Sequence, residues 1–275
     1  MRSRRKWFWG ALFCAALLAC AQAAAGAPRN PFANLGAMKS YFVDKRIGYV
    51  EGSAFEEVCK KTFPRALRVS FESEKAMTEG LLAGKIEGYL TTLPSAQMTV
   101  AAEKKLWLPP VVVKKDNYAW ALSRSNEKLI SRINAALRRI EKEGGMEKLQ
   151  ARWLNGDISA RTVPDYDLNG RRGKFRVVTD GDSAPFIFLR DGKMLGYEVE
   201  LLMNVAKALD YDVEFEVMSL ADLVPAVVSG RCDVAVACLS VTNGRRKQIR
   251  FTEPIFEGGV VMVVHEGVKP LESGK

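Results

Sequence analysis

The sequence predicts an α/β protein built from two similar units. From Lys174 onward, short valine-rich runs alternate with longer segments whose apolar residues recur at helical spacing, which is the pattern of strands and helices around a parallel sheet. The stretch from Arg46 to Thr92 repeats this alternation. The chain has 275 residues, of which 48% are hydrophobic and 27% charged, so it can bury one large core or two modest ones.

The unit nearer the C-terminus contains the pattern in its clearest form. A valine-rich strand precedes a segment in which leucine, valine and alanine share one helical face, and a charged strand, a helix ended by a glycine and an apolar strand follow. We expect strands at 175–179, 212–217 and 232–237 and helices at 197–209 and 221–230. Three strands separated by two helices form a βαβαβ unit.

The earlier unit follows the same logic. We expect strands at 46–50, 67–71 and 86–92 and helices at 53–61 and 75–82, the second of which Gly84 ends. Between the two units, apolar residues at helical spacing over 129–140 predict an amphipathic helix, which a glycine pair interrupts before a shorter helix begins at Met146. A second α/β sheet with parallel strands is therefore expected.

The first 23 residues predict a secretory signal peptide. Four basic residues precede an apolar run from Trp7 to Leu18, and small residues follow, which is the pattern of a segment removed on export. The apolar run is short for a membrane span. Residues 17–20 also form an imperfect lipobox that places a lipid on Cys20, whereas residues 21–23 offer an ordinary A-x-A cleavage site. We expect a periplasmic or otherwise extracytoplasmic chain, attached to a membrane only through such a lipid.

The charge pattern argues against nucleic acid as a partner. Removal of residues 1–23 takes away four basic residues and no acidic one, so the formal charge falls from +9 to +5. The remaining lysines and arginines are spread among acids and lack the interleaved aromatic residues of a single-strand binding groove. We expect no nucleic-acid partner.

The cysteines and the histidine predict neither a disulfide framework nor a metal or cofactor site. Outside the signal peptide the cysteines are Cys59, Cys232 and Cys238, an odd number without framework spacing. On one strand, Cys232 and Cys238 would lie six residues apart at about 3.3 Å each, which is too far to bridge. The single histidine, His265, has no partner ligands beside it, so metal catalysis and histidine-based triads lose their basis.

Several stretches resemble a known family. The sequence from KFRVVTDGDSAPF to YEVELLMNVAKAL at 174–209 and the sequence from DLVPAVVSG to FTEPIF at 222–256 resemble lobe 1 of the family 3 bacterial solute-binding proteins, the polar amino-acid receptors of ABC importers. The stretches at 44–58, 81–92 and 118–153 resemble lobe 2 of that family and its closing helices. The resemblance implies a periplasmic-binding-protein type II fold, with two α/β lobes joined by two crossover strands.

The lobes stand in the reverse of the family's order. The family runs from lobe 1 to lobe 2, whereas here lobe 2 comes first, which predicts a circularly permuted order; a fragment of a tandem receptor is the other explanation. We expect lobe 2 at 30–117, completed by the C-terminal strand at 258–275, and lobe 1 at 118–257, including the closing helices at 127–154.

Arg245 is the principal candidate ligand residue. It follows Thr242 where the strand 232–237 gives way to a turn, and it matches the arginine that in this family clamps a ligand α-carboxylate. A planar guanidinium meets both carboxylate oxygens. Ser240 and Thr242 match positions that face the same carboxylate, although capping of a turn explains either of them as well. The alternative for Arg245 is a solvated surface arginine.

Lobe 2 contributes the start of a helix. Ser53 follows the strand 46–50 and begins the helix, so unpaired backbone N–H groups point toward the cleft and suit an anionic ligand group. Ser53 and Glu56 also make a capping box, which explains the serine without a ligand. On the other lobe, Asp180 either faces the cleft or caps the turn after its strand.

The usual counter-charge for a ligand ammonium is missing from its matching place. Thr91 and Thr92 stand where the family has an acidic residue on lobe 2. A buried ammonium without a carboxylate is costly. Either Asp180 or Asp182 therefore replaces the acid, or the ligand has no α-amino group.

The expected pocket walls also depart from the family. Ser183 and Leu220 replace aromatic residues, and Ala54 replaces a threonine. Phe55, Leu220 and Cys238 suggest a partly apolar pocket, although each could equally belong to the core. These positions leave the identity of the ligand open.

We therefore expect a protein that captures a small carboxylate-bearing solute, most simply an amino acid, by hinge closure near Tyr118 and Phe256, and delivers it to an ABC-transporter permease. The main alternative is a ligand-sensing module for a signalling partner. A dehydratase-like enzyme on the same fold is disfavoured, because an enzyme needs a positioned acid or base and the cleft offers no histidine.

Overall fold

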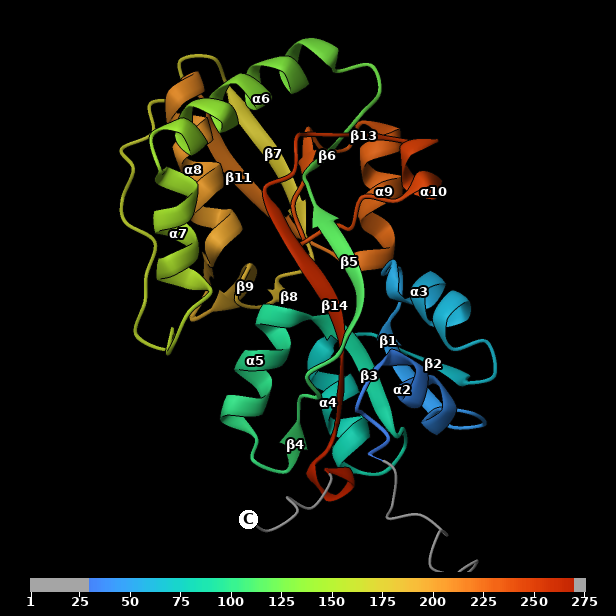
Figure 1. Cartoon of the computed structure of the whole chain (residues 1–275). Helices are drawn as coiled ribbons and strands as arrows, with labels where there is room; N and C mark the ends of the chain where they lie inside the picture. Colours follow the sequence, from blue (N-terminus) through green and yellow to red (C-terminus); the bar gives the residue numbers. More distant parts are fainter. Residues whose placement is uncertain (1–29, 270–275) are drawn as a thin grey trace, which may run out of the picture.

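The computed structural model describes residues 30–269, which form two α/β lobes (Figure 1). The N-terminal part of this segment forms the lobe that we call lobe 2, and the part that follows forms lobe 1. The predicted signal peptide, residues 1–23 with Cys20, lies outside the described residues.

Lobe 2 is built on a six-stranded sheet with the order β2-β1-β3-β14-β4, in which β5 also pairs with β14. The three predicted strands β1, β2 and β3 are parallel, whereas β14 runs antiparallel to β3, β4 and β5. The sheet is therefore mixed, because β14 arrives from lobe 1 and not through a helical crossover within lobe 2. Its strands are β1 (Arg46–Val50), β2 (Leu67–Phe71), β3 (Gly88–Thr92), β4 (Leu106–Trp107), β5 (Val112–Tyr118) and β14 (Phe256–His265).

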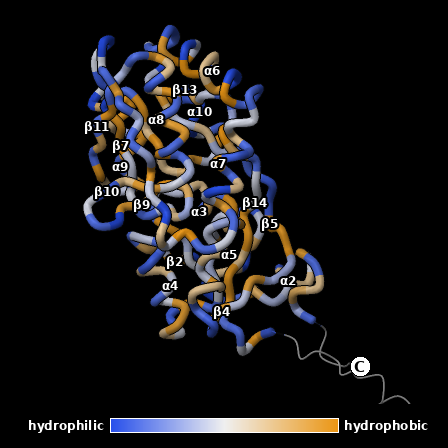
Figure 2. Tube along the Cα trace, turned by 90° about the vertical axis from the view of Figure 1, so that its left-hand side faces the viewer, coloured by the Kyte–Doolittle hydropathy of each residue, from blue (hydrophilic) through white to orange (hydrophobic). Residues whose placement is uncertain are grey.

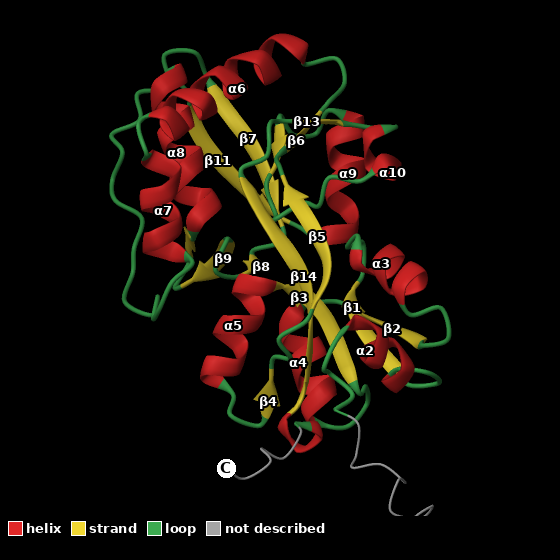
Figure 3. Ribbon diagram, in the orientation of Figure 1, coloured by secondary structure: helices red, strands yellow, loops and turns green. Residues whose placement is uncertain are grey.

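Helices cover both faces of this sheet (Figure 3). Along β14, alternate residues face opposite clusters: Val260, Met262 and Val264 join one core, and Val261 and Val263 join the other. Residues 260–264 of β14 are all apolar and buried, and the trace of this strand is coloured as hydrophobic in Figure 2. The helices of the lobe are α2 (Leu35–Tyr41), α3 (Phe55–Thr62), α4 (Glu74–Leu82), α5 (Leu93–Ala102) and the short 3-10 helix η1 (Glu266–Val268).

Lobe 1 is built on a five-stranded sheet with the order β11-β7-β12-β6-β13 and a small three-stranded sheet, β10-β9-β8. Strands β7, β11 and β12 are parallel, as expected for a βαβαβ unit. The strands are β6 (Ala121–Leu122), β7 (Lys174–Thr179), β8 (Asp182–Ser183), β9 (Ile187–Arg190), β10 (Lys193–Leu195), β11 (Asp212–Val217), β12 (Val234–Ala235) and β13 (Arg250–Phe251).

The helices of lobe 1 are the predicted ones, with one short addition. Gly230 ends α9 in the left-handed conformation, with φ +74°. In α6 the buried face contains Ile130, Ile133 and Leu137, as the apolar spacing predicted. The helices are α6 (Glu127–Lys142), α7 (Gly145–Trp153), α8 (Tyr197–Leu209), α9 (Leu220–Ser229) and α10 (Asn243–Arg246).

One predicted strand is shorter than expected. The sequence pattern predicted a strand over 232–237, but β12 spans Val234–Ala235. Val236 donates one more hydrogen bond to Val178, and the chain then turns away to Cys238, whose φ is +48°. This turn takes the segment after β12 out of the sheet and toward lobe 2.

Within residues 30–269 the chain passes between the lobes twice, from β5 to β6 and from β13 to β14. The two passages lie side by side, because Tyr118 at the end of β5 is the register partner of Phe256 at the start of β14. Their rings stack with centroids 6.1 Å apart and an interplanar angle of 16°. The passage from β5 to β6 also contacts the segment after β12, where Tyr118 forms a bridge with Ser240 and the N–H of Ala119 donates to the backbone oxygen of Leu239 at 3.1 Å.

Candidate functional site

A pocket lies between the lobes, at the carboxyl ends of their parallel strands. The segments after β1, β2 and β3 line it from lobe 2, and the segments after β7, β11 and β12 line it from lobe 1. In open α/β sheets the carboxyl ends of parallel strands are where ligands bind. The cavity has a volume of about 140 Å³.

The structure brings almost all of the predicted ligand residues together around this pocket. Thr242 is the exception. The side chain of Thr242 accepts a hydrogen bond from the backbone N–H of Arg245 at 3.2 Å and caps α10. Thr242 therefore has the capping role that was the predicted alternative to ligand contact. The predicted residues that line the pocket are Ser53, Ala54, Phe55, Thr92, Asp180, Ser183, Leu220, Cys238, Ser240 and Arg245.

The guanidinium of Arg245 points into the pocket without an acidic partner. Its Nη1 donates to the backbone oxygen of Ser240 at 3.0 Å, and its Nη2 donates across the cleft to the backbone oxygen of Gly52 at 2.9 Å. No carboxylate lies within salt-bridge distance of it among residues 30–269. Burial lowers the pKa of Arg245 to about 10, and the nearby carboxylate of Asp116, which pairs with Lys114, opposes this shift. The pocket thus contains a cation that forms no salt bridge with the residues lining it.

The start of α3 forms the wall beneath Arg245, but not through the predicted capping box. The N-cap position is Ala54, which has no capping side chain, and Ser53 Oγ accepts the N–H of Phe55 at 3.3 Å. Glu56 takes no part in this arrangement. The capping-box prediction is wrong, because the helix begins two residues after Ser53 and the serine closes a local turn instead.

Glu74 supplies an acidic side chain that the sequence reasoning missed. It is the first residue of α4, whose N-cap Ser73 follows strand β2. Thr91 Oγ1 donates to Glu74 Oε1 at 2.5 Å. Burial is the largest cause that raises the pKa of Glu74 to about 8, and the nearby carboxylates of Asp182 and Asp180 raise it further.

Two more acids face the pocket from the loop after β7. Asp180 Oδ2 accepts the hydroxyl of Ser183 at 2.7 Å, so this aspartate both lines the pocket and fixes the turn that follows its strand. Burial raises the pKa of Asp180 to about 6. Burial also raises the pKa of Asp182, whose Oδ2 accepts the backbone N–H of Glu74 at 2.9 Å.

Cys238 forms part of the pocket wall, and its backbone is held by a buried acid. Its N–H donates to Glu198 Oε1 at 2.9 Å, which holds the residue in its positive-φ conformation. Burial raises the pKa of the Cys238 thiol and raises that of Glu198 to about 8. Cys59, Cys232 and Cys238 are free thiols, of which Cys59 and Cys232 are buried and Cys238 is partly exposed.

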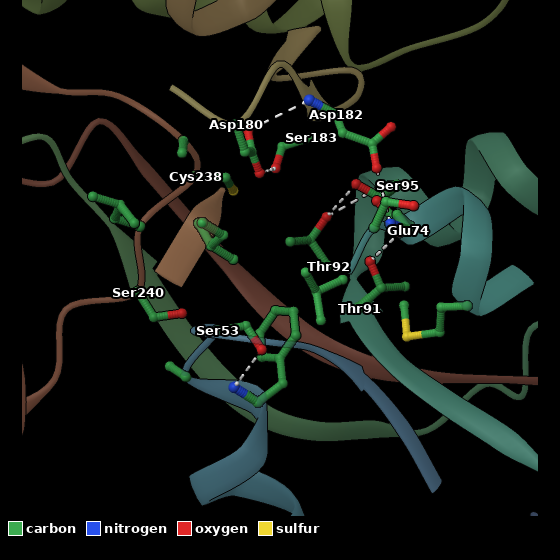
Figure 4. Close-up of a pocket in the computed structure, with 18 of the residues that line it drawn as sticks. Ser53, Glu74, Thr91, Thr92, Ser95, Asp180, Asp182, Ser183, Cys238 and Ser240 are labelled. Carbon is green, nitrogen blue, oxygen red and sulfur yellow. Dashed lines mark hydrogen bonds between the residues drawn. The ribbon is translucent and has the colours of Figure 1, made fainter. Parts of the chain in front are cut away.

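Several contacts hold the two lobes against each other around the pocket. Besides the bond between Arg245 and Gly52, Ser95 Oγ donates to the backbone oxygen of Ala184 at 2.6 Å. The N–H of Glu74 and the carboxylate of Asp182 form a third link. Figure 4 shows Ser95, Glu74 and Asp182 beside one another at the edge of the cavity. The arrangement is a closed cleft around a small, strongly polar space.

Comparison with known proteins supports the relationship that the sequence resemblance implies. Residues 175–271 match the family model of the bacterial extracellular solute-binding proteins, family 3. The chain is 31% identical over 96 residues to a probable histidine-binding protein of Neisseria gonorrhoeae. The aligned segment covers 34% of this chain and 36% of the relative. The chain is also 29% identical over 118 residues to the L-cystine-binding protein of Escherichia coli, and this segment covers 42% of this chain and 44% of the relative. These relatives are named as binding proteins and not as enzymes.

The matched region is only part of each protein. The chain spans between a third and a half of the length of these curated relatives. Among solved structures, an ancestral arginine-binding protein bound to glutamine is 38% identical over 31% of this chain and 38% of its own, with a TM-score of 0.30. Within residues 30–269, no helix is long and apolar enough to cross a membrane.

Proposed function

We propose that this protein is an extracytoplasmic solute-binding protein that captures a small carboxylate-bearing solute, an amino acid or a related compound, and delivers it to the permease of an ABC importer. The observation that carries this proposal is the unpaired guanidinium of Arg245 inside the pocket between the lobes. The match of residues 175–271 to the family 3 solute-binding proteins supports it.

The carboxylate specificity follows from the chemistry of Arg245. Two of its N–H groups are engaged by the backbone oxygens of Ser240 and Gly52, which fix the plane of the guanidinium and leave further donors for a ligand. Burying a cation without a counter-ion is unfavourable, and a ligand carboxylate removes that penalty. A hydrogen bond to a charged group contributes about 1.5–3 kcal/mol.

Capture would occur by closure of the lobes about the two chain passages near Tyr118 and Phe256. Opening the cleft breaks the hydrogen bonds that cross it from Arg245, Ser95 and Glu74, so a ligand that bridges Arg245 and lobe 2 favours the closed form by its differential affinity.

A thermal-shift screen followed by calorimetry tests the function. Amino acids and the matching carboxylic acids without an amino group form the panel, because a ligand that binds the folded state raises its melting temperature. Arg245→Ala should weaken the best ligand at least about tenfold, the equivalent of about 1.4 kcal/mol. Arg246→Ala, an exposed neighbour, is the matched control. Unchanged affinity in Arg245→Ala would remove this residue from the site.

We also propose that the lobes are circularly permuted relative to the family. The first and last described segments lie close together in lobe 2, since the ring centroid of Phe32 is 5.3 Å from that of Trp107, and Trp107 pairs with Val264. Termini that lie close together permit permutation. A rearranged chain that begins near residue 170 and joins residue 269 to residue 30 by a short linker should bind the same ligand. An insoluble product with no ligand-dependent stabilisation would argue against permutation.

Gene neighbourhood separates transport from sensing. Adjacent permease and ATPase genes would support delivery to an importer, whereas an adjacent sensor kinase gene would support the signalling alternative.

A further inference from the structure

We infer that the pocket selects a short zwitterion of about six non-hydrogen atoms, with its carboxylate at Arg245 and its ammonium at Glu74. This inference rests on the proposed solute-binding function and names the class of solute. It places the missing counter-charge on α4, a helix to which the sequence resemblance assigned no ligand residue.

The first step is the position of Glu74. Thr91 and Thr92 stand where the family has the acid that binds a ligand ammonium. The hydroxyl of Thr91 donates a hydrogen bond to Glu74 Oε1 at 2.5 Å. The threonine thus orients a carboxylate that comes from another element of the same lobe. The second oxygen, Oε2, has no hydrogen-bond partner among the described residues, so it is available to a ligand donor.

The second step is the separation of the charges. Arg245 is anchored at Ser240 on one side of the cavity. Figure 4 shows Glu74 with Thr91 and Ser95 on the opposite side from Ser240. The pocket therefore has one basic end and one acidic end, which matches a ligand that carries both charges.

The third step is the lack of a salt bridge at the acidic end. Neither Glu74 nor Asp180 nor Asp182 forms a salt bridge with a lysine, arginine or histidine of residues 30–269. Lys75 lies near enough to lower the pKa of Asp182, but its salt bridge is with Glu79. Burial raises the pKa of Glu74 and of Asp180, and it raises the pKa of Asp182 although that side chain is more exposed. A ligand ammonium stabilises the ionised form of such a carboxyl group, whereas an amine-free acid leaves Glu74 protonated and without a charged partner.

The fourth step is size. The cavity measures about 140 Å³. A cavity of about 150 Å³ accepts a molecule of the size of benzene, which has six non-hydrogen atoms. Glycine, alanine and serine fall close to that size, while glutamine and arginine exceed it. The side chains of Phe55, Leu220 and Cys238 close the remaining space.

The experiment is a titration of the mature protein with matched probes. Glycine, L-alanine and L-serine have the expected size and charges. Propionate lacks only the amino group of alanine, ethylamine lacks its carboxylate, and L-glutamine and L-arginine are longer. We expect the three small amino acids to raise the melting temperature and to bind at least tenfold more tightly than the other four probes.

Glu74→Gln tests the acidic end. The amide oxygen can still accept the hydroxyl of Thr91, so the fold should be retained, and the affinity for L-alanine should fall at least tenfold while that for propionate does not fall. Glu79→Gln is the matched control, because Glu79 is an exposed residue on the same helix. Circular dichroism and the melting temperature check that both variants fold.

The outcomes separate this inference from the proposed function. Tight binding of L-arginine or L-glutamine that depends on Arg245 would overturn the size limit and leave the solute-binding function standing. Equal affinity for propionate and L-alanine, or unchanged alanine affinity in Glu74→Gln, would overturn the role of Glu74. Failure of every carboxylate to bind would overturn both proposals.

Discussion

Gly52 lies where the lobes approach each other closely, and replacing it tests whether the closed cleft is the ligand-bound form. A Cβ added at Gly52 would lie 2.4 Å from Cα, 2.6 Å from N and 2.9 Å from Cβ of Ala221 at the start of α9. Carbon atoms normally approach to about 3.5–4.0 Å. These are mostly backbone atoms, so no side-chain rotation relieves the contact, and the lobes must separate by about 1 Å.

The size of the effect follows from the bond that this separation removes. Arg245 Nη2 donates to the backbone oxygen of Gly52 at 2.9 Å, and a bond lengthened by about 1 Å is no longer a hydrogen bond. Losing a hydrogen bond to a charged group costs about 1.5–3 kcal/mol. We therefore expect Gly52→Ala to weaken ligand binding by about ten- to a hundredfold.

Gly84 provides the control for backbone strain. Both glycines have positive φ, +76° at Gly52 and +70° at Gly84, but a Cβ at Gly84 would meet nothing within 4 Å. Each alanine therefore introduces similar strain, about 1–2 kcal/mol, and only one blocks closure. Calorimetry with the best ligand of the panel should give a large loss of affinity for Gly52→Ala and none for Gly84→Ala. Parental affinity in Gly52→Ala would refute the identification of this closed arrangement with the bound state.

Two further predictions concern stability. Buried Glu198 has a pKa raised to about 8 from an ordinary value of 4.5, so the folded chain keeps a proton that the unfolded chain releases, and the free energy of unfolding falls as pH rises between these values. Glu198→Gln removes this loss of stability, which amounts to at most about 1.4 kcal/mol per pH unit. In urea denaturation, the stability of the variant relative to the parent should therefore increase from about pH 5 to about pH 7.5. A difference between the two proteins that does not vary with pH would contradict this prediction. Tyr197→Phe should cost about 1–3 kcal/mol in the same assay, because the Tyr197 hydroxyl donates to the buried backbone oxygen of Ile255 at 2.5 Å; an unchanged denaturation midpoint would show that this oxygen needs no partner.

The sequence predicted those parts of the fold that depend on local pattern. The helix expected at 197–209 is α8 with the same bounds, because its apolar face is continuous and a positive-φ residue, Asp210, follows it. The strands at 46–50 and 67–71 were likewise predicted with the bounds that the structure gives them. β12 was predicted too long, since apolar character continues beyond the residues that pair with its neighbours.

The candidate site was predicted in part, and its missing member has a spatial cause. Asp180, Cys238 and Ser240 were found because they follow apolar strands, and Arg245 was found because it matches a position of the family that the sequence resembles. Glu74 was missed, because its carboxylate reaches the pocket only through the parallel placement of β2 beside β1, a relation that no short stretch of sequence contains. A rule that examines the first helical residues after every parallel strand would have found it.

The pairing of Tyr118 with Phe256 also determines how the two lobes depend on each other. Since β5 and β14 are adjacent antiparallel strands, the whole of lobe 1 is an insertion at the tip of a β-hairpin that belongs to lobe 2. The two ends of the insertion stay together whether or not its interior is folded, so ordering lobe 1 requires little additional loop-closure entropy once lobe 2 has formed. Strands β6 and β13 pair next to the same two ends inside lobe 1, so an ordered lobe 1 holds the hairpin strands together in turn, and each lobe lowers the entropic cost of ordering the other.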